Sequence, residues 1–116
     1  MNYREILERF KERVPQIRAI IFCDHEGEAI EFVSEFDSYH TQICGAAQSE
    51  LMLSCKIACK QQAAGDIASL ELRTALGAIS LWPIGTQYYL AVMAKQPLPS
   101  HHPAVREVRR TLEADV

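Results

Sequence analysis

Residues 44–58 read CGAAQSELMLSCKIA, and this stretch decides the fold. It is the middle of a proline-free segment, residues 39–63, whose composition predicts one long helix. Asp37 or Ser38 can accept a backbone hydrogen bond as the N-cap of this helix. The Gly-Asp pair at 65–66 is a typical helix end. We therefore expect a single helix that dominates the chain.

This helix is apolar on two sides when its residues are placed on a wheel at about 100° per residue. One half of the wheel can cover a sheet and holds Ile43, Cys44, Ala47, Leu51, Met52, Cys55, Ala58 and Cys59. A second stripe, displaced round the helix, holds Ala46, Leu53 and Ile57. A helix that covers one sheet needs only one stripe. The second stripe therefore either packs under other helices of the chain or meets a partner protein.

The segment after the helix, residues 67–75, reads IASLELRTA. Leu70 and Leu72 alternate there with polar residues, which is typical of an exposed or edge strand. An edge strand can extend a sheet across a protein contact. Small helix residues would let two such helices approach closely: Gly45, Ala46, Ala47, Ser49 and Ser54. The two features together indicate a symmetric dimer.

The remaining segments complete a regular order of elements. We expect an amphipathic helix up to Pro15, a final helix starting near Pro103, and four more strands, at residues 17–23, 29–35, 78–84 and 87–95. In the second of these strands, alternation places Ile30 and Phe32 on one face. The order is helix, strand, strand, long helix, three strands, helix. It favours an α+β fold with one five-stranded antiparallel sheet, in a single domain spanning residues 1–116.

This order of elements resembles the roadblock/dynein light chain family, with a roadblock/profilin-like sheet. The resemblance is carried by IIFCDHEGEAIEF at 20–32, by the helix quoted above and by ISLWPIGTQYYLAVMAK at 79–95. Within this family, the chain is most similar to the bacterial branch, which consists of the MglB-like regulators of Ras-like small GTPases of the MglA type. The chain departs from the common pattern in its three helix cysteines and its Trp82–Pro83 step.

The resemblance implies a homodimer with a continuous sheet, whose paired long helices form a platform for a small GTPase. Some members of the bacterial branch act there as GTPase-activating proteins without a catalytic arginine of their own, and other members of the family act as scaffolds. Asp24 and Gly27 match the polar turn of the family's first hairpin. The implied dimer or partner interface consists of Gly45, Ala46, Ser49, Leu53, Lys56, Ile57, Leu70, Leu72 and Arg73.

The composition narrows the classes of partner. The formal net charge is −3, with 48% hydrophobic and 23% charged residues, so no basic surface for nucleic acid is indicated. The longest apolar runs fall far short of the roughly 20 residues that span a bilayer. Charges throughout the first helix disfavour a secretory signal, so we expect a cytoplasmic protein with free thiols and no membrane insertion.

Chemical sites are weaker alternatives. Cys23 with His25, or Cys55 with Cys59, could contribute zinc ligands, but the spacing is not that of a zinc site. Cys23 and His25 could also form a nucleophile pair if both lay on one strand, although His25 is expected in a turn. No glycine-rich phosphate loop is present. We expect no catalytic residues, metal or cofactor.

A small-molecule sensor remains an alternative, because Trp82, Tyr88 and Tyr89 could line a pocket between sheet and helix, although aromatic strand residues more often pack in a core. A purely structural adaptor is a further alternative. The sequence favours a homodimeric, non-enzymatic regulator or scaffold that binds a small GTPase.

Overall fold

One antiparallel sheet of five strands, in the order β2-β1-β5-β4-β3, forms the centre of the molecule. The computed structural model describes residues 1–116. Its elements are α1 (Tyr3–Arg13), β1 (Ile17–Asp24), β2 (Ala29–Ser34), α2 (Ser38–Gln61), β3 (Leu70–Thr74), β4 (Gly77–Ile84), β5 (Tyr88–Ala94) and α3 (Pro103–Glu113). The predicted order of elements and the α+β class are confirmed.

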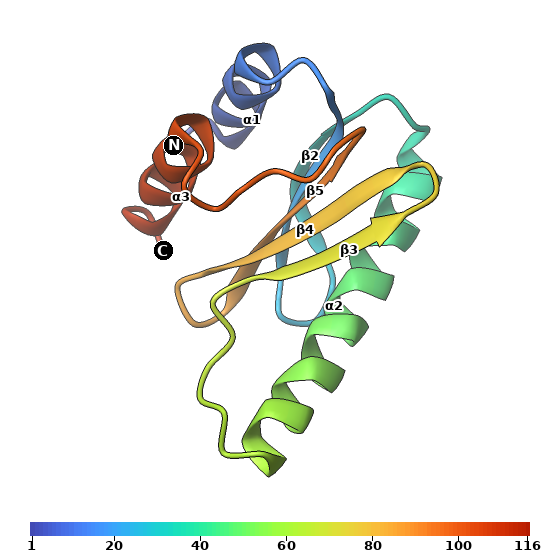
Figure 1. Ribbon diagram of the computed structural model, residues 1–116. Helices are drawn as coiled ribbons and strands as arrows, with labels where there is room; N and C mark the ends of the chain where they lie inside the picture. The colour runs from blue at the N-terminus through green and yellow to red at the C-terminus, as the bar shows by residue number, and fades with distance from the viewer.

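The helices lie in two layers, with α1 and α3 on one face of the sheet and α2 on the other (Figure 1). The apolar run of β1 explains this arrangement, because successive side chains point to opposite faces. Ile20 and Phe22 pack in the core beneath the terminal helices, whereas Ile21 and Cys23 pack in the core beneath α2. Both faces of this strand are therefore covered, as its nearly continuous apolar sequence requires.

The terminal helices are fastened to each other as well as to the sheet. The hydroxyl of Tyr3 donates a hydrogen bond to the Asp115 carboxylate, and the Arg13 guanidinium pairs with Glu107. The bond to Asp115 raises the pKa of Tyr3, because it holds the phenol proton and its acceptor is negatively charged. Since α1 and α3 cover only this face, α2 is left without a helix above it (Figure 1).

A β-bulge interrupts the pairing of β1 with β2. Phe22 pairs with Glu31 and Cys23 with Ala29, so Ile30 is the extra residue on β2. The prediction that Ile30 and Phe32 share a face is therefore wrong. Phe32 packs against the core beneath α2, whereas Ile30 is 43% exposed.

The end of α2 also differs from the sequence expectation. The backbone N–H of Ala63 donates to the Lys60 carbonyl at 3.2 Å, and that of Ala64 to the Cys59 carbonyl at 2.9 Å. Ala63 adopts the left-handed conformation with φ 54°, so it closes the helix in the place usually taken by glycine. Gly65, which the sequence predicted as the helix end, lies two residues further on. No helix is both long and apolar enough to cross a membrane.

Candidate functional site

The solvent-facing side of α2 carries a stripe of apolar residues. Tyr39 and Leu53 are 75% and 58% exposed, and Ile43 and Ile57 are about half exposed. With Ala46, which is also exposed, they fall within about 80° of one another on the helical wheel. We call these five residues the outer stripe. Large apolar side chains gathered on one helix face mark a contact surface, whereas singly scattered ones do not.

The side of α2 that faces the sheet is unusually polar. Its buried residues are Thr41, Gly45, Gln48, Ser49 and Met52. The Thr41 hydroxyl donates to the Asp37 carbonyl at 2.8 Å and lies 3.0 Å from the Ser34 hydroxyl, so its burial is satisfied. Ile43 and Ala47, which the wheel assigned to the sheet-facing half, are exposed instead. This helix therefore reverses the pattern of an ordinary surface helix.

Close packing against the first hairpin explains how α2 is turned. A Cβ added to Gly45 would lie 3.4 Å from Cγ2 of Ile21, and the Ser49 hydroxyl donates to the His25 carbonyl at 3.1 Å. Gly27 adopts φ +89°, and a Cβ there would lie 3.0 Å from Cα of Ala46. Only small residues at these contacts let the helix approach so closely.

The core beneath α2 is much smaller than the core on the other face of the sheet. It contains six buried residues, whereas the core beneath α1 and α3 contains sixteen. Seven partly buried hydrophobic residues surround the smaller core, Leu70 and Met93 among them. The helix packs mainly against β2, β1 and β5, so it leaves the β3 side of the sheet less covered. The part of this face next to β3 therefore lacks a covering element.

Strand β3 forms the open edge of the sheet. It pairs only with β4, and four of its five residues are exposed, Leu72 by 42%. Leu72 lies two residues from Leu70 and therefore points to the α2 side, like Leu70. The opposite edge, β2, packs against α1 and is tied to it by the 3.0 Å ion pair between Arg4 and Glu31. An unpaired, exposed edge is a template for another strand.

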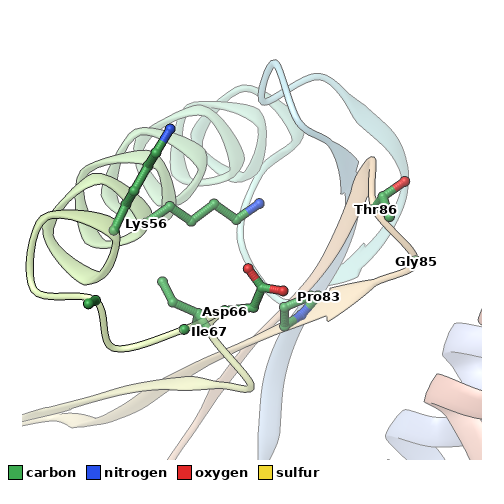
Figure 2. A pocket seen from close by; sticks show the side chains of 9 residues that line it. Lys56, Asp66, Ile67, Pro83, Gly85 and Thr86 are labelled. Atoms are coloured by element: carbon green, nitrogen blue, oxygen red, sulfur yellow. The ribbon is translucent and has the colours of Figure 1, made fainter.

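A surface groove of about 800 Å³ lies between the end of α2, the loop that follows it and the β4–β5 turn. Figure 2 shows Lys56, Asp66 and Thr86 among its lining side chains. The Lys56 ammonium donates to the Tyr89 hydroxyl at 3.3 Å and lies 5.0 Å from the centre of that ring, which fixes it against the sheet. None of the lining residues is buried, so this groove is not the enclosed cavity of a typical small-molecule site.

Solved structures with the same arrangement of elements establish what the fold is. A roadblock/LC7 domain from Streptomyces avermitilis is 16% identical, with a TM-score of 0.80 over 97% of this chain and 92% of that chain. The fold is that of roadblock/LC7 domains. Myxococcus xanthus MglB gives a TM-score of 0.84 at 11% identity, over 99% and 97% of the two chains. An MglB with a tetrameric arrangement gives 0.82 at 10%, over 96% and 85%.

At these identities the similarity of the roadblock structures establishes the fold alone. No protein-family model matches the chain, and no curated protein matches its sequence. The role of each residue therefore has to be argued from its own contacts.

The residues expected at an interface divide into three groups on this roadblock fold. Ala46, Leu53 and Ile57 are exposed in the outer stripe, and Leu72 and Arg73 are exposed on β3. Lys56 and Leu70 are half-buried. Gly45 and Ser49 are buried between α2 and the first hairpin, so the single chain does not expose them at the interface that the resemblance implies. Tyr39 and Ile43 also belong to the outer stripe, although the sequence did not indicate them as interface residues.

Cys23 and His25 do not have the properties of a nucleophile pair. Burial raises the pKa of the Cys23 thiol to about 12, the opposite of the low pKa of a reactive thiolate. His25 lies in the exposed turn after β1. No group of three or more His, Cys, Asp or Glu side chains is placed to hold a metal ion.

The three aromatic residues considered for a ligand pocket lie on different faces of the sheet. Trp82 is buried in the core beneath the terminal helices, and Tyr88 packs against that same core. Tyr89 is buried in the core beneath α2. The indole N–H of Trp82 donates to the Ser100 hydroxyl at 3.1 Å, so its polar group is already satisfied. These side chains therefore do not line one pocket.

Proposed function

We propose that this chain is a homodimeric, non-enzymatic regulator or scaffold, which binds a Ras-like small GTPase on the helical platform of its dimer. The observation that carries the proposal is the orientation of α2, which turns Thr41, Gln48 and Ser49 toward the sheet and the outer stripe toward solvent. A helix that exposes its apolar side needs a protein to cover it.

Two features support the homodimer. The core beneath α2 is small and bordered by partly buried apolar residues, so a second copy packed beside α2 would complete it. On the open edge of β3, Leu70 and Leu72 point to the α2 side, where the core is small. One contact could therefore extend the sheet and cover these leucines together, as in isologous dimers.

The small GTPase as partner is supported by the resemblance to the MglB-like branch, together with the similarity to MglB structures. The proposed mechanism is positional. A platform that binds the switch regions of a GTPase in one of their two arrangements shifts its nucleotide state or hydrolysis rate without supplying catalytic groups. Such a protein would act in the cytoplasm, where small GTPases cycle.

GTP hydrolysis by the Ras-like GTPases of the same genome, measured with and without this protein, tests the proposal. We expect one of them to bind in a nucleotide-dependent manner and to change its hydrolysis rate. Ile57→Asp should abolish the effect, because it puts a charge into the outer stripe. Ile30→Asp is the matched control, since Ile30 is an exposed isoleucine on the opposite edge of the sheet. If no GTPase binds in either nucleotide state, the GTPase role is refuted.

A further inference from the structure

The sequence of β3 is complementary to itself. Its five residues, LELRT, alternate between the two faces of the sheet. Leu70, Leu72 and Thr74 point to the α2 side, and Glu71 and Arg73 point to the other side, where their side chains form an ion pair with Nε 3.0 Å from Oε2. The strand therefore has one acidic and one basic residue placed symmetrically about Leu72.

Symmetry restricts how two copies of this edge can pair. A two-fold axis perpendicular to the sheet makes the two β3 strands antiparallel and keeps both α2 helices on one face. In this arrangement, two residues that lie directly opposite each other point to the same face of the sheet. Because side chains alternate between the faces along each strand, the numbers of two opposed residues are both even or both odd, and their sum is even. A parallel pair would put the two α2 helices on opposite faces, which would leave each small core uncovered.

Charge and the number of paired residues decide among the registers that remain. A register centred on Glu71 places two glutamates opposite each other, and one centred on Arg73 places two arginines opposite each other. Like charges directly opposite in a sheet are destabilising, whereas opposite charges stabilise the pair. A register centred on Leu72 pairs all five residues and puts each Glu71 opposite the partner's Arg73. It is also the register with the longest ladder.

We propose that the contact between the two β3 edges has one register, with Leu72 opposite the partner's Leu72 and Glu71 opposite the partner's Arg73. The inference rests on the homodimer of the proposed function and adds the register and the charges that select a second copy of this chain. The two leucines meet on the α2 side, where the core is incomplete. The two Glu71–Arg73 ion pairs, one within each chain, are exchanged for two pairs across the contact. A related chain with a different edge strand would lose these pairs.

Two charge-reversed chains test the register. Glu71→Arg gives a strand with two arginines, and Arg73→Glu gives a strand with two glutamates. Each alone should dimerise more weakly than the wild type, on the order of tenfold, because its cross-strand pairs become repulsive. Mixed together, they should form a heterodimer well above the statistical half of all dimers, measured by native mass spectrometry with one chain mass-tagged. Neither variant can form a Glu–Arg pair between residues 71 and 73 with a copy of itself. Only contact across β3 therefore explains a preference for the heterodimer.

The control is Glu12→Arg, which reverses an exposed charge on α1, remote from β3, and should leave dimerisation unchanged. Circular dichroism checks that each variant is folded, and E71R/R73E, which restores opposite charges, should dimerise like the wild type. Higher salt should reduce the preference for the heterodimer. A wild-type dimer whose single variants dimerise normally and mix at random refutes this register and leaves the homodimer standing. A monomeric wild-type protein refutes both.

Discussion

The hydroxyl of Ser49 donates a hydrogen bond of 3.1 Å to the backbone carbonyl of His25, which ties the middle of α2 to the turn after β1. Ser49 is 5% exposed, so this bond lies in the contact between helix and hairpin. It helps to set the rotation of α2 that turns the outer stripe to solvent. The stability of this contact can be measured separately from assembly.

Ser49→Ala should lower the free energy of unfolding by about 1 kcal/mol, because it leaves the His25 carbonyl without this donor. The mass in solution should not change, since Ser49 faces the first hairpin. Ser54→Ala is the matched control: Ser54 lies on the same helix but is exposed, so its loss should cost nothing or add slightly to helix stability. Urea unfolding followed by circular dichroism measures both. Equal effects of the two substitutions would contradict this role of Ser49.

Gly27→Ala should destabilise the protein by roughly 2–3 kcal/mol. The added methyl group meets Cα of Ala46 at 3.0 Å and Cβ of Ser49 at 3.1 Å, and φ of +89° is unfavourable for alanine. Gly65→Ala is the control for the backbone term alone, because Gly65 has φ +87° and nothing within 4 Å of an added Cβ. Gly65→Ala should lower the free energy of unfolding by about 1 kcal/mol. A loss no larger at Gly27 than at Gly65 would mean that α2 does not pack tightly on the hairpin.

Ala63→Gly should stabilise the protein by about 0.5–1 kcal/mol, because φ of 54° suits glycine better than alanine. Ala64→Gly, at the next residue, is the control and should not be stabilising, since Ala64 does not have a positive φ. Thermal unfolding of the three proteins gives the comparison. A destabilised Ala63→Gly protein would show that the helix does not end in this motif.

Alkaline pH should lower the free energy of unfolding, because the thiol of Cys23 is buried. Its pKa is about 12 in the folded chain, against 9.0 ordinarily, so the unfolded chain releases the proton first as pH rises. The stabilisation is present in full below about pH 9 and is lost between pH 9 and 12, by up to about 1.4 kcal/mol per pH unit. Cys23→Ala should unfold with a shallower pH dependence over this range. Parallel curves for the two proteins would contradict the burial of this thiol.

Much of the fold follows from the sequence, because the order of elements depends on local patterns. The apolar run of β1, the alternation around Leu70 and Leu72 and the proline that begins α3 all predict elements that the structure contains. The edge position of β3 is also predictable, since charged residues alternate with its leucines. These features depend on a few neighbouring residues.

The orientation of α2 was not predictable, because a helical wheel counts apolarity and not hydrogen bonds. Thr41 and Ser49 are buried since each finds an acceptor, and Gly45 allows close approach to β1. The exposed position of Ile43 follows from this rotation. The bulge at Ile30 depends likewise on the pairing of two strands, which alternation along one strand does not reveal.

The central claim is that a second copy of the chain covers the edge of β3 and the part of the apolar surface of α2 that contains Leu53. Light scattering during size-exclusion chromatography, at micromolar concentration, tests it most directly. The account predicts twice the chain mass for the wild type and a shift toward monomer for Leu53→Asp, with Ile30→Asp remaining a dimer. A wild-type protein that runs as a monomer at this concentration would contradict the account.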